Sequence, residues 1–472
     1  MTAADRFLSR LGDIVGRDHV LAADEQKAPF LTDWRGRYHG AALAVVQPRL
    51  SSEVAAVVGA CMSEGVAVVP QGGNTGLCGG ATPVAGIGSV VVNLSRMSRI
   101  RLVDQANNTL VAEAGCKLAA VQAAAAEVGR LFPLSLASEG SCEIGGNIST
   151  NAGGVHVLRY GNMRDLVLGI EAVLPDGRIW DGLRALRKDN TGYDLKQLLI
   201  GAEGTLGIIT AAVLKLFPVP RESATAWIAV PDPSAAVSLL GLLRDCCGDR
   251  VNAFEIISSV ALALVLRHIP DARAPLARSD SEWFVLVELA DAGPGQHLSA
   301  LLEVALTRAA EAGLADDAVV AASLTQSKTL WGLRENISEA QRIEGVSIKH
   351  DVSVPVSRIP QFLEDAQSAV AAHWPDARIV VFGHIGDGNL HYNLSKPDAV
   401  DNADFIRLTS EVNRVIHDLV VGHGGSISAE HGLGQLKRDE ILRYKSDVEM
   451  DLMRAIKRTL DPRGLMNPGK VV

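Results

Sequence analysis

Residues 70–80 read Pro70-Gln71-Gly72-Gly73-Asn74-Thr75-Gly76-Leu77-Cys78-Gly79-Gly80, directly after a short apolar run that is typical of a buried strand. Glycines let a backbone approach an anion closely and offer its N–H groups as donors, and Asn74 and Thr75 can add side-chain hydrogen bonds to phosphate oxygens. The loop is not a Rossmann fingerprint, because no GxGxxG opens a helix here, and no Walker lysine follows. An isolated loop of this kind is more often only a tight turn.

Two further glycine-rich segments lie in the same half of the chain. Residues 138–154 read SEGSCEIGGNISTNAGG, and residues 201–207 read GAEGTLG. Three loops that allow close backbone approach suit an extended ligand with a diphosphate at its middle. The set therefore favours a dinucleotide over a small metabolite.

Working outward from these loops, the chain alternates helix-like and strand-like segments, so the pattern predicts an α+β fold. The predicted segments include helices at 51–64 and 118–128 and strands at 66–70, 89–94, 109–113 and 170–174. Pro218 and Pro220 mark a boundary, after which longer helices are predicted. These are expected at about 233–247, 295–312, 325–344, 403–421 and 447–460, with strands at 283–289 and 379–382.

The bulk composition limits the classes of protein. The 472 residues are too many for one hydrophobic core, and 47% hydrophobic with 21% charged residues is the balance of a folded protein. A net charge of −9 without a basic run argues against a nucleic-acid partner. The longest apolar runs, such as 260–266, are too short to span a membrane. Residues 1–20 suggest an amphipathic helix rather than a signal peptide, so a cytoplasmic protein with reduced thiols is expected.

The motifs PQGGNTGLCGG (70–80), GGNISTNAGG (145–154), YGNMRDLVLGIEAVLPDG (160–177) and GAEGTLGIIT (201–210) together resemble the vanillyl-alcohol-oxidase-type FAD-binding (PCMH-type) domain. Within that superfamily, the chain from about residue 43 to 472 is similar to the branch of FAD-linked D-2-hydroxy-acid dehydrogenases. The resemblance implies an FAD-binding domain at 38–217 and a substrate-binding α+β domain at 218–400. A mostly helical segment at 401–472 would complete the active site and pack on the FAD domain. The implied FAD contacts are Gln71, Gly72, Gly73, Asn74, Thr75, Gly76, Leu77, Ser138, Gly145, Gly146, Asn147, Thr150, Asn151, Gly153, Gly154, Glu203, Gly207, Ile208 and Asn467.

A second constellation lies in the other half. Residues 382–393 place His384 and His391 on a strand–loop–strand, and residues 424–432 supply Glu430 beside His431. Two histidines and one glutamate are a familiar ligand set for Zn²⁺ or a similar first-row ion. Any one histidine more often satisfies a local hydrogen bond, but two glycine-rich loops that carry four such residues favour a site. The resemblance implies that His384, His391 and Glu430 are the ligands and that His431 is the general base.

A predicted helix carries Arg334 and Ser338 at a spacing of i and i+4, and Lys349 precedes a predicted strand. Such residues are most often solvated, but the resemblance implies that they bind a dicarboxylate, with Asn393 as a further donor. Ser338 stands where threonine is expected and keeps the hydroxyl. Lactate and glycolate have one carboxylate, which would make a second cation surplus. The pair of cations therefore favours 2-hydroxyglutarate, with malate next.

Several alternatives remain open. D-lactate or glycolate oxidation is possible in the same fold, and the resemblance implies that lactate-oxidising relatives carry an uncharged residue in place of Lys349. A metal-dependent hydrolase or a flavin-binding subunit of a larger complex would be a different class. Beyond a small 2-hydroxy acid, the expected partners are an electron-transfer flavoprotein or a quinone as electron acceptor, with a homodimer as a candidate assembly.

Relatives that attach flavin covalently often do so through a histidine in the first glycine loop, and Asn74 occupies that place here. We therefore predict that FAD is held non-covalently. Acid precipitation should release the yellow chromophore into the supernatant, where its absorbance can be measured. Colour that stays with the precipitated protein would contradict this prediction.

Overall fold

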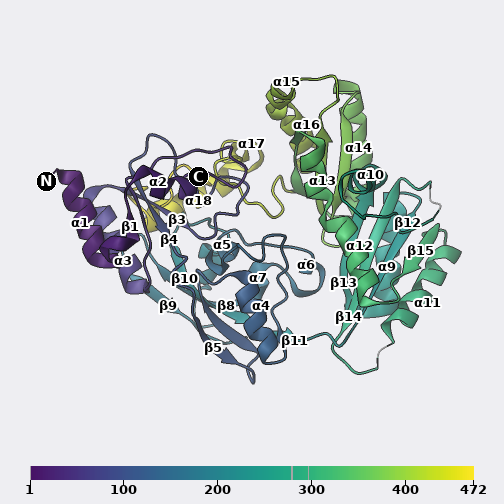
Figure 1. The fold of residues 1–472 in the computed structure, drawn as a ribbon, viewed down its shortest axis with the longest axis horizontal. Helices are drawn as coiled ribbons and strands as arrows, with labels where there is room; N and C mark the ends of the chain where they lie inside the picture. The colour runs from purple at the N-terminus through teal and green to yellow at the C-terminus, as the bar shows by residue number, and fades with distance from the viewer. Residues whose placement is uncertain (1, 278–279, 296) are drawn as a thin grey trace. The chain divides into compact units, whose positions relative to one another are not determined.

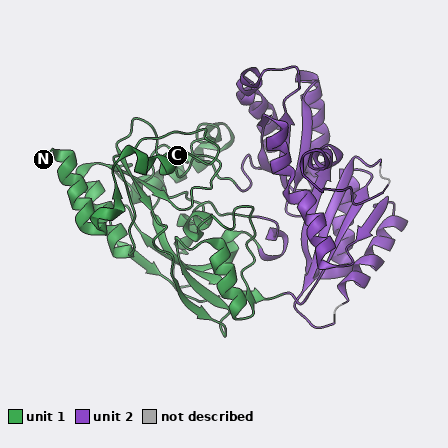
Figure 2. Ribbon diagram, in the orientation of Figure 1, with its two compact units in different colours: residues 1–153, 161–219, 431–472 green, residues 154–160, 220–430 purple. Residues whose placement is uncertain are grey.

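The computed structural model describes residues 2–277, 280–295 and 297–472, which form two compact units (Figures 1 and 2). Unit 1 comprises Met1–Gly153, Gly161–Val219 and His431–Val472, and unit 2 comprises Gly154–Tyr160 and Pro220–Glu430. The predicted boundary at 217/218 lies beside the observed division after Val219. The predicted boundary at 400/401 lies inside unit 2, which continues to Glu430.

Unit 1 contains two main sheets. The first has the order β1-β2-β4-β3, with β2 and β3 parallel to β4, and the second is antiparallel with the order β5-β6-β10-β8-β9. The strands are β1 Val20–Leu21, β2 Ala44–Val46, β3 Ala67–Gln71, β4 Ser89–Asn93, β5 Ile100–Asp104, β6 Thr109–Glu113, β8 Val167–Val173, β9 Ile179–Gly182 and β10 Ile208–Lys215, beside the short pair β7 Arg130–Leu131 and β11 Phe217–Pro218. The helices are α1 Ala3–Val15, α2 Asp24–Lys27, α3 Ser51–Glu64, α4 Leu118–Glu127, α5 Ile144–Ser149, α7 Met163–Leu166, α8 Lys196–Leu199, α17 Ile441–Tyr444 and α18 Asp447–Leu460.

The core of unit 1 fixes the start of the first glycine loop. Helices α1 and α3 pack their apolar residues, such as Leu11 and Val57, against the valines of β2, β3 and β4. The loop leaves β3 at Gln71, and the C-terminal end of the chain returns to the same strand. Met466 pairs with Val68, and the Asn467 N–H donates to the Val68 carbonyl at 2.7 Å. The last residues of the chain therefore lie beside the loop that the sequence assigns to the cofactor.

Unit 2 is built on an antiparallel sheet with the order β15-β12-β14-β13-β18-β19-β16, and β17 pairs with β19. The strands are β12 Glu222–Val230, β13 Val251–Ser258, β14 Trp283–Asp291, β15 Asp317–Val320, β16 Ser347–Ile348, β17 Asp351–Ser353, β18 Arg378–Gly383 and β19 Asn389–Ser395. The helices are α6 Val157–Tyr160, α9 Pro233–Cys247, α10 Ser259–His268, α11 Leu298–Glu311, α12 Leu324–Glu335, α13 Ile337–Glu344, α14 Ile359–His373, α15 Asn402–Arg407 and α16 Thr409–Gly422.

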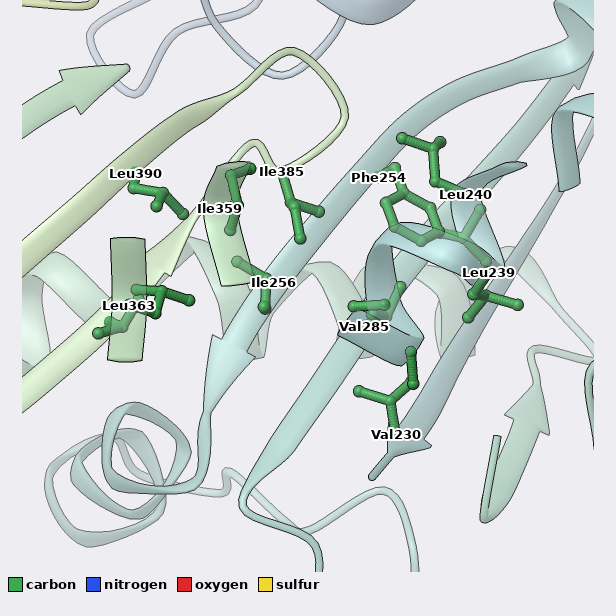
Figure 3. Packing of buried hydrophobic residues seen from close by; sticks show 14 of the residues in the cluster. Val230, Leu239, Leu240, Phe254, Ile256, Val285, Ile359, Leu363, Ile385 and Leu390 are labelled. Carbon is green, nitrogen blue, oxygen red and sulfur yellow. The ribbon is translucent and has the colours of Figure 1, made fainter. Parts of the chain in front are cut away.

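Helices cover both faces of this sheet, which explains why its strands are apolar on both sides. Successive residues of a strand point to opposite faces. On β12, Ile228 belongs to the core under α9, α11, α14 and α16, whereas Trp227 belongs to the core under α10, α12 and α13. Figure 3 shows the first of these cores, in which Leu239 and Leu240 of α9 lie near Phe254 and Val285 of the strands.

Two predicted helices are interrupted. The helix expected at 325–344 divides into α12 and α13 at Asn336, whose side-chain amide donates to the Gly332 carbonyl at 2.8 Å. Asparagine competes in this way with the backbone ladder of a helix, and the pattern of apolar residues does not reveal it. The helix expected at 403–421 likewise divides into α15 and α16 at Leu408. The helix expected at 295–312 begins at Leu298, and Gln296 lies outside the described residues.

Among the described residues, no helix combines the length and the apolar character that crossing a membrane requires.

Candidate active site

The three glycine-rich loops line one pocket in unit 1. The empty space of this pocket is about 870 Å³, and part of it is open to solvent. The predicted FAD contacts that line it are Gln71, Gly72, Gly73, Asn74, Thr75, Gly76, Gly145, Gly146, Asn147, Thr150, Glu203, Gly207 and Ile208. The loops that the sequence connected only by their composition thus meet around one space.

At two of these positions, the absence of a side chain leaves room for a ligand. A Cβ atom added to Gly76 or Gly146 would meet no protein atom within 4 Å, and neither residue has a left-handed backbone. At Gly73, by contrast, a Cβ would lie 2.1 Å from the Ser141 carbonyl oxygen, so this glycine is required by the packing of the first loop on the second. The pocket wall at Gly76 and Gly146 is therefore open on the side where an anionic cofactor would lie, and the residues fit FAD.

Two predicted FAD contacts hold the pocket together through their own hydrogen bonds. The Glu203 carboxylate accepts hydrogen bonds from the backbone N–H groups of Leu433 at 2.7 Å and Gly434 at 2.9 Å. The Asn467 side-chain amide donates to the carbonyls of Gly80 at 3.0 Å and Glu203 at 2.7 Å. These bonds fasten the C-terminal segment of unit 1 to the first and third glycine loops.

Some predicted FAD contacts do not line this pocket. They are Leu77, Ser138, Asn151, Gly153, Gly154 and Asn467. The Asn151 side chain accepts a hydrogen bond from the Arg164 backbone, whereas Gly154 belongs to unit 2. Other lining residues were not predicted as FAD contacts: Pro70, Cys78, Gly80, Ala81, Leu94, Glu143, Ser149, Gly204, Ile209 and His431.

Glu143 is the most unusual of these additional residues. Its side chain is only 6% exposed, and its Oε2 atom has no hydrogen-bond partner among the described residues. Burial raises the pKa of Glu143 to about 7, and Lys117 opposes this only in part. The pocket therefore contains a carboxyl group that is largely protonated below neutral pH. An isolated glutamate directly before Ile144-Gly145-Gly146 was the available sequence signal.

The predicted metal ligands lie together in unit 2. His384 lies in the β18–β19 loop, His391 is on β19, and Glu430 ends the segment that follows α16. One potential ligand atom from each lies within 4.8 Å of the others. Bonds to zinc are about 2.0–2.2 Å, so small side-chain movements would bring all three donors onto one ion. The donor set and its spacing fit a first-row divalent ion.

Neighbouring groups orient these donors. His384 Nδ1 lies 2.6 Å from Glu255 Oε1, which turns Nε2 towards Glu430, whose Oε1 is 4.0 Å away. Burial disfavours the imidazolium, but Glu255 outweighs this effect and raises the pKa of His384 to about 9. An ion bound at Nε2 therefore displaces a proton. Two hydrogen bonds hold Glu430. Its backbone N–H donates to the Asp351 carboxylate at 2.9 Å, and its Oε1 atom accepts a hydrogen bond from the Gly154 N–H at 2.6 Å.

The predicted substrate residues differ in their surroundings. Arg334 is buried, and its Nε donates to Glu255 Oε2 at 2.8 Å. Asn393 is buried as well, and its amide donates to Gln341 while its oxygen accepts the His350 N–H. Ser338 is exposed on α13, on the far side of the interruption at Asn336, and Lys349 is half-buried between β16 and β17. The expected single helix face through Arg334 and Ser338 is thus broken between them.

Profiles of two protein families match this chain. The family described as "FAD binding domain" matches residues 42–182, and "FAD linked oxidases, C-terminal domain" matches residues 219–471. D-2-hydroxyglutarate dehydrogenase from Xanthomonas citri pv. viticola is 41% identical, covering 93% of this chain and 91% of the relative. D-2-hydroxyglutarate dehydrogenase from Stutzerimonas stutzeri is 38% identical, covering 98% of this chain and 98% of the relative. The mitochondrial D-2-hydroxyglutarate dehydrogenase from Arabidopsis thaliana is also 38% identical, covering 98% of this chain and 81% of the relative.

Solved structures agree on the fold. Substrate-bound p-cresol methylhydroxylase superposes with a TM-score of 0.76 at 18% identity, covering 99% of this chain and 96% of the other. For 4-ethylphenol oxidase from Gulosibacter chungangensis the TM-score is 0.74 at 19% identity, covering 100% and 98%. The α+β architecture with a PCMH-type FAD-binding domain is thereby confirmed.

The pocket of glycine loops and the two matching profiles define an FAD-binding oxidoreductase. The chain belongs to the FAD-linked oxidase family, and the resemblance inferred from its motifs is confirmed.

The buried Glu143 predicts a pH-dependent stability. The folded protein keeps this proton up to about pH 7, whereas the unfolded chain releases it near pH 4.5. The wild type therefore loses stability as the pH rises through this window, and a neutral glutamine does not. Between pH 5 and pH 8, we expect flavin-free Glu143→Gln to gain about 1–3 kcal/mol over the wild type in urea unfolding. The exposed Glu127→Gln is the control, and parallel pH curves for Glu143→Gln and wild type would refute the prediction.

Proposed function

We propose that this protein oxidises D-2-hydroxyglutarate to 2-oxoglutarate, with FAD as the hydride acceptor and a divalent ion, most simply Zn²⁺, at His384, His391 and Glu430. The observation that carries the proposal is the junction at residues 430 and 431. Glu430 belongs to the cluster of metal-type donors in unit 2, and His431 lines the FAD-type pocket in unit 1. One peptide bond joins the two residues, so the candidate metal ligand and the candidate proton acceptor belong to the same short segment.

The chemistry divides among these groups. When bound, the ion would lower the pKa of the substrate hydroxyl group, and FAD would take up the hydride. His431 accepts the hydroxyl proton, for which a neutral imidazole near pH 7 is suited. The C2–H bond of the substrate breaks with its electron pair, and the C2–O bond becomes the carbonyl of the 2-oxo acid. The proton thus goes to His431, and the hydride with its electron pair would go to the flavin.

The choice of a diacid rests on two cations of unit 2 and on the relatives. Arg334 uses Nε for Glu255, and its terminal amino groups suit the planar oxygens of a carboxylate. Lys349 provides the second positive charge, and relatives at 36–41% identity carry the name D-2-hydroxyglutarate dehydrogenase. D-malate, D-lactate and glycolate are the alternative substrates. An electron-transfer flavoprotein or quinone acceptor, a homodimer and a cytoplasmic location stay predictions.

If His431 is the base, His431→Ala should lower turnover by roughly 10²–10⁴-fold, the usual worth of a positioned proton acceptor. FAD and metal content, measured by absorbance and elemental analysis, should remain near the wild-type stoichiometry. His423→Ala, which removes an imidazole paired with Asp365 at 2.9 Å, is the control and should keep its activity. Loss of the metal in His431→Ala would instead make this residue a ligand.

The diacid prediction is tested at Lys349. A distal carboxylate that loses its partner in a partly desolvated pocket should cost roughly 2–5 kcal/mol. Lys349→Met should therefore depress kcat/KM for D-2-hydroxyglutarate strongly and change that for D-lactate little. Lys328→Met, at an exposed position of α12, is the matched control. An unchanged ratio of the two kcat/KM values in Lys349→Met would remove the main physical support for a diacid substrate.

A further inference from the structure

We propose that Glu255 is a positioning residue that couples the metal centre to the substrate carboxylate. One of its carboxylate oxygens holds the metal-ligand candidate His384, and the other holds the substrate-binding candidate Arg334. The inference rests on the proposed function, because it assumes that a metal and a carboxylate substrate bind at these two residues.

The surroundings of Glu255 explain why its charge must be matched. It lies in the middle of β13, a strand whose residues are all buried, and its own side chain is fully buried. Ile257, two residues further along β13, belongs to the apolar core under α10, α12 and α13. Residues two positions apart on a strand point to the same face, so Glu255 points into that same layer. A carboxylate in such a layer is stable only when it is paired and hydrogen-bonded. Glu255 meets this requirement with two partners, His384 and Arg334.

The first partner fixes the metal ligand. Glu255 Oε1 lies 2.6 Å from His384 Nδ1, so Nδ1 carries the proton and donates it in this hydrogen bond. The nitrogen that is left to bind a metal is then Nε2, which faces Glu430. A carboxylate behind a histidine ligand commonly sets the tautomer and the direction of the ring in this way.

The second partner fixes the substrate cation. Arg334 Nε donates to Glu255 Oε2 at 2.8 Å, and the guanidinium lies over the Phe382 ring at 4.8 Å. The same Phe382 ring packs against His391, with their centroids 4.8 Å apart. The guanidinium is thus held in one plane, and its hydrogen bond to Glu255 uses Nε rather than either terminal amino group. A planar carboxylate is best met by that pair of donors.

These contacts make Glu255 a shared support. If its carboxylate is lost, both the His384 ring and the Arg334 guanidinium lose the acceptor that orients them. A residue with a purely structural role would affect the stability of the sheet without changing Zn²⁺ affinity or the substrate KM. The two readouts therefore separate the proposed role from a packing role.

The chain offers a matched control. Glu288 on β14 faces the same side of the sheet, accepts a hydrogen bond from Trp331 Nε1 of α12 at 3.0 Å, and accepts another from Asn252 at 2.7 Å. Glu255 and Glu288 therefore each hold one side chain of α12 with one carboxylate oxygen. Only Glu255 holds a predicted metal ligand with the other.

The experiment compares FAD-loaded wild type with Glu255→Gln and Glu288→Gln. Zn²⁺ dissociation constants are measured by competition with a chromophoric chelator, and KM for D-2-hydroxyglutarate is measured at saturating Zn²⁺. We expect Glu255→Gln to weaken Zn²⁺ binding by roughly 10–100-fold and to raise KM by roughly tenfold. Glu288→Gln should change neither value. Glu255→Asp keeps the charge but is too short to reach both partners, so it should shift both values in the same direction. This variant replaces Glu255→Gln in the experiment if Glu255→Gln does not fold.

The outcomes are distinct. Wild-type Zn²⁺ affinity in a folded Glu255 variant would overturn the proposal. A weakened Zn²⁺ affinity with a wild-type KM at saturating Zn²⁺ would overturn the coupling, because Glu255 would then serve His384 alone. Failure of the wild type to bind Zn²⁺, or to oxidise D-2-hydroxyglutarate, would instead count against the proposed function.

Discussion

A carboxylate buried between apolar layers has to be neutralised by partners that the fold brings to it, and unit 2 contains one such group. Glu255 is fully buried on β13, and its partners come from α12 and from the β18–β19 loop. The sheet order places β18 beside β13, while the packing of α12 on the same face supplies the arginine. The orientation of a predicted metal ligand and of a predicted substrate cation thus follows from a single charge.

Unit 1 has a different constraint, which is to keep open a pocket whose wall contains many glycines. Glycine removes side chains from the wall but also removes the contacts that would hold the loops in place. Here Glu203 and Asn467 supply those contacts by bonding to backbone groups of the C-terminal segment and of the first loop. The last residues of the chain are therefore part of the pocket's framework.

The sequence predicted the features that depend on local pattern. The glycine loops, the histidine and glutamate donors and most helices are visible as short motifs or periodicities. In the structure the loops line one pocket, the three donors lie together, and most helices lie where they were predicted. Glu255 was missed because its partners Arg334 and His384 lie 79 and 129 positions further along the chain. The available signal was one ionisable residue in the apolar strand Ala253-Phe254-Glu255-Ile256-Ile257, which already requires a buried partner. The interruption at Asn336 was missed because a side-chain hydrogen bond to the backbone leaves no trace in apolar spacing.

The pairing of Arg334 with Glu255 limits what this arginine can contribute to carboxylate selectivity. A cation that is already paired presents a smaller net charge to the substrate, so it contributes orientation more than long-range attraction. Its planar donors would then match the shape of a carboxylate, while the half-buried Lys349 would carry the second positive charge. A monoacid can satisfy the first requirement but leaves the second unmet. Discrimination between 2-hydroxy acids would therefore depend on the lysine, and the arginine would be common to all of them.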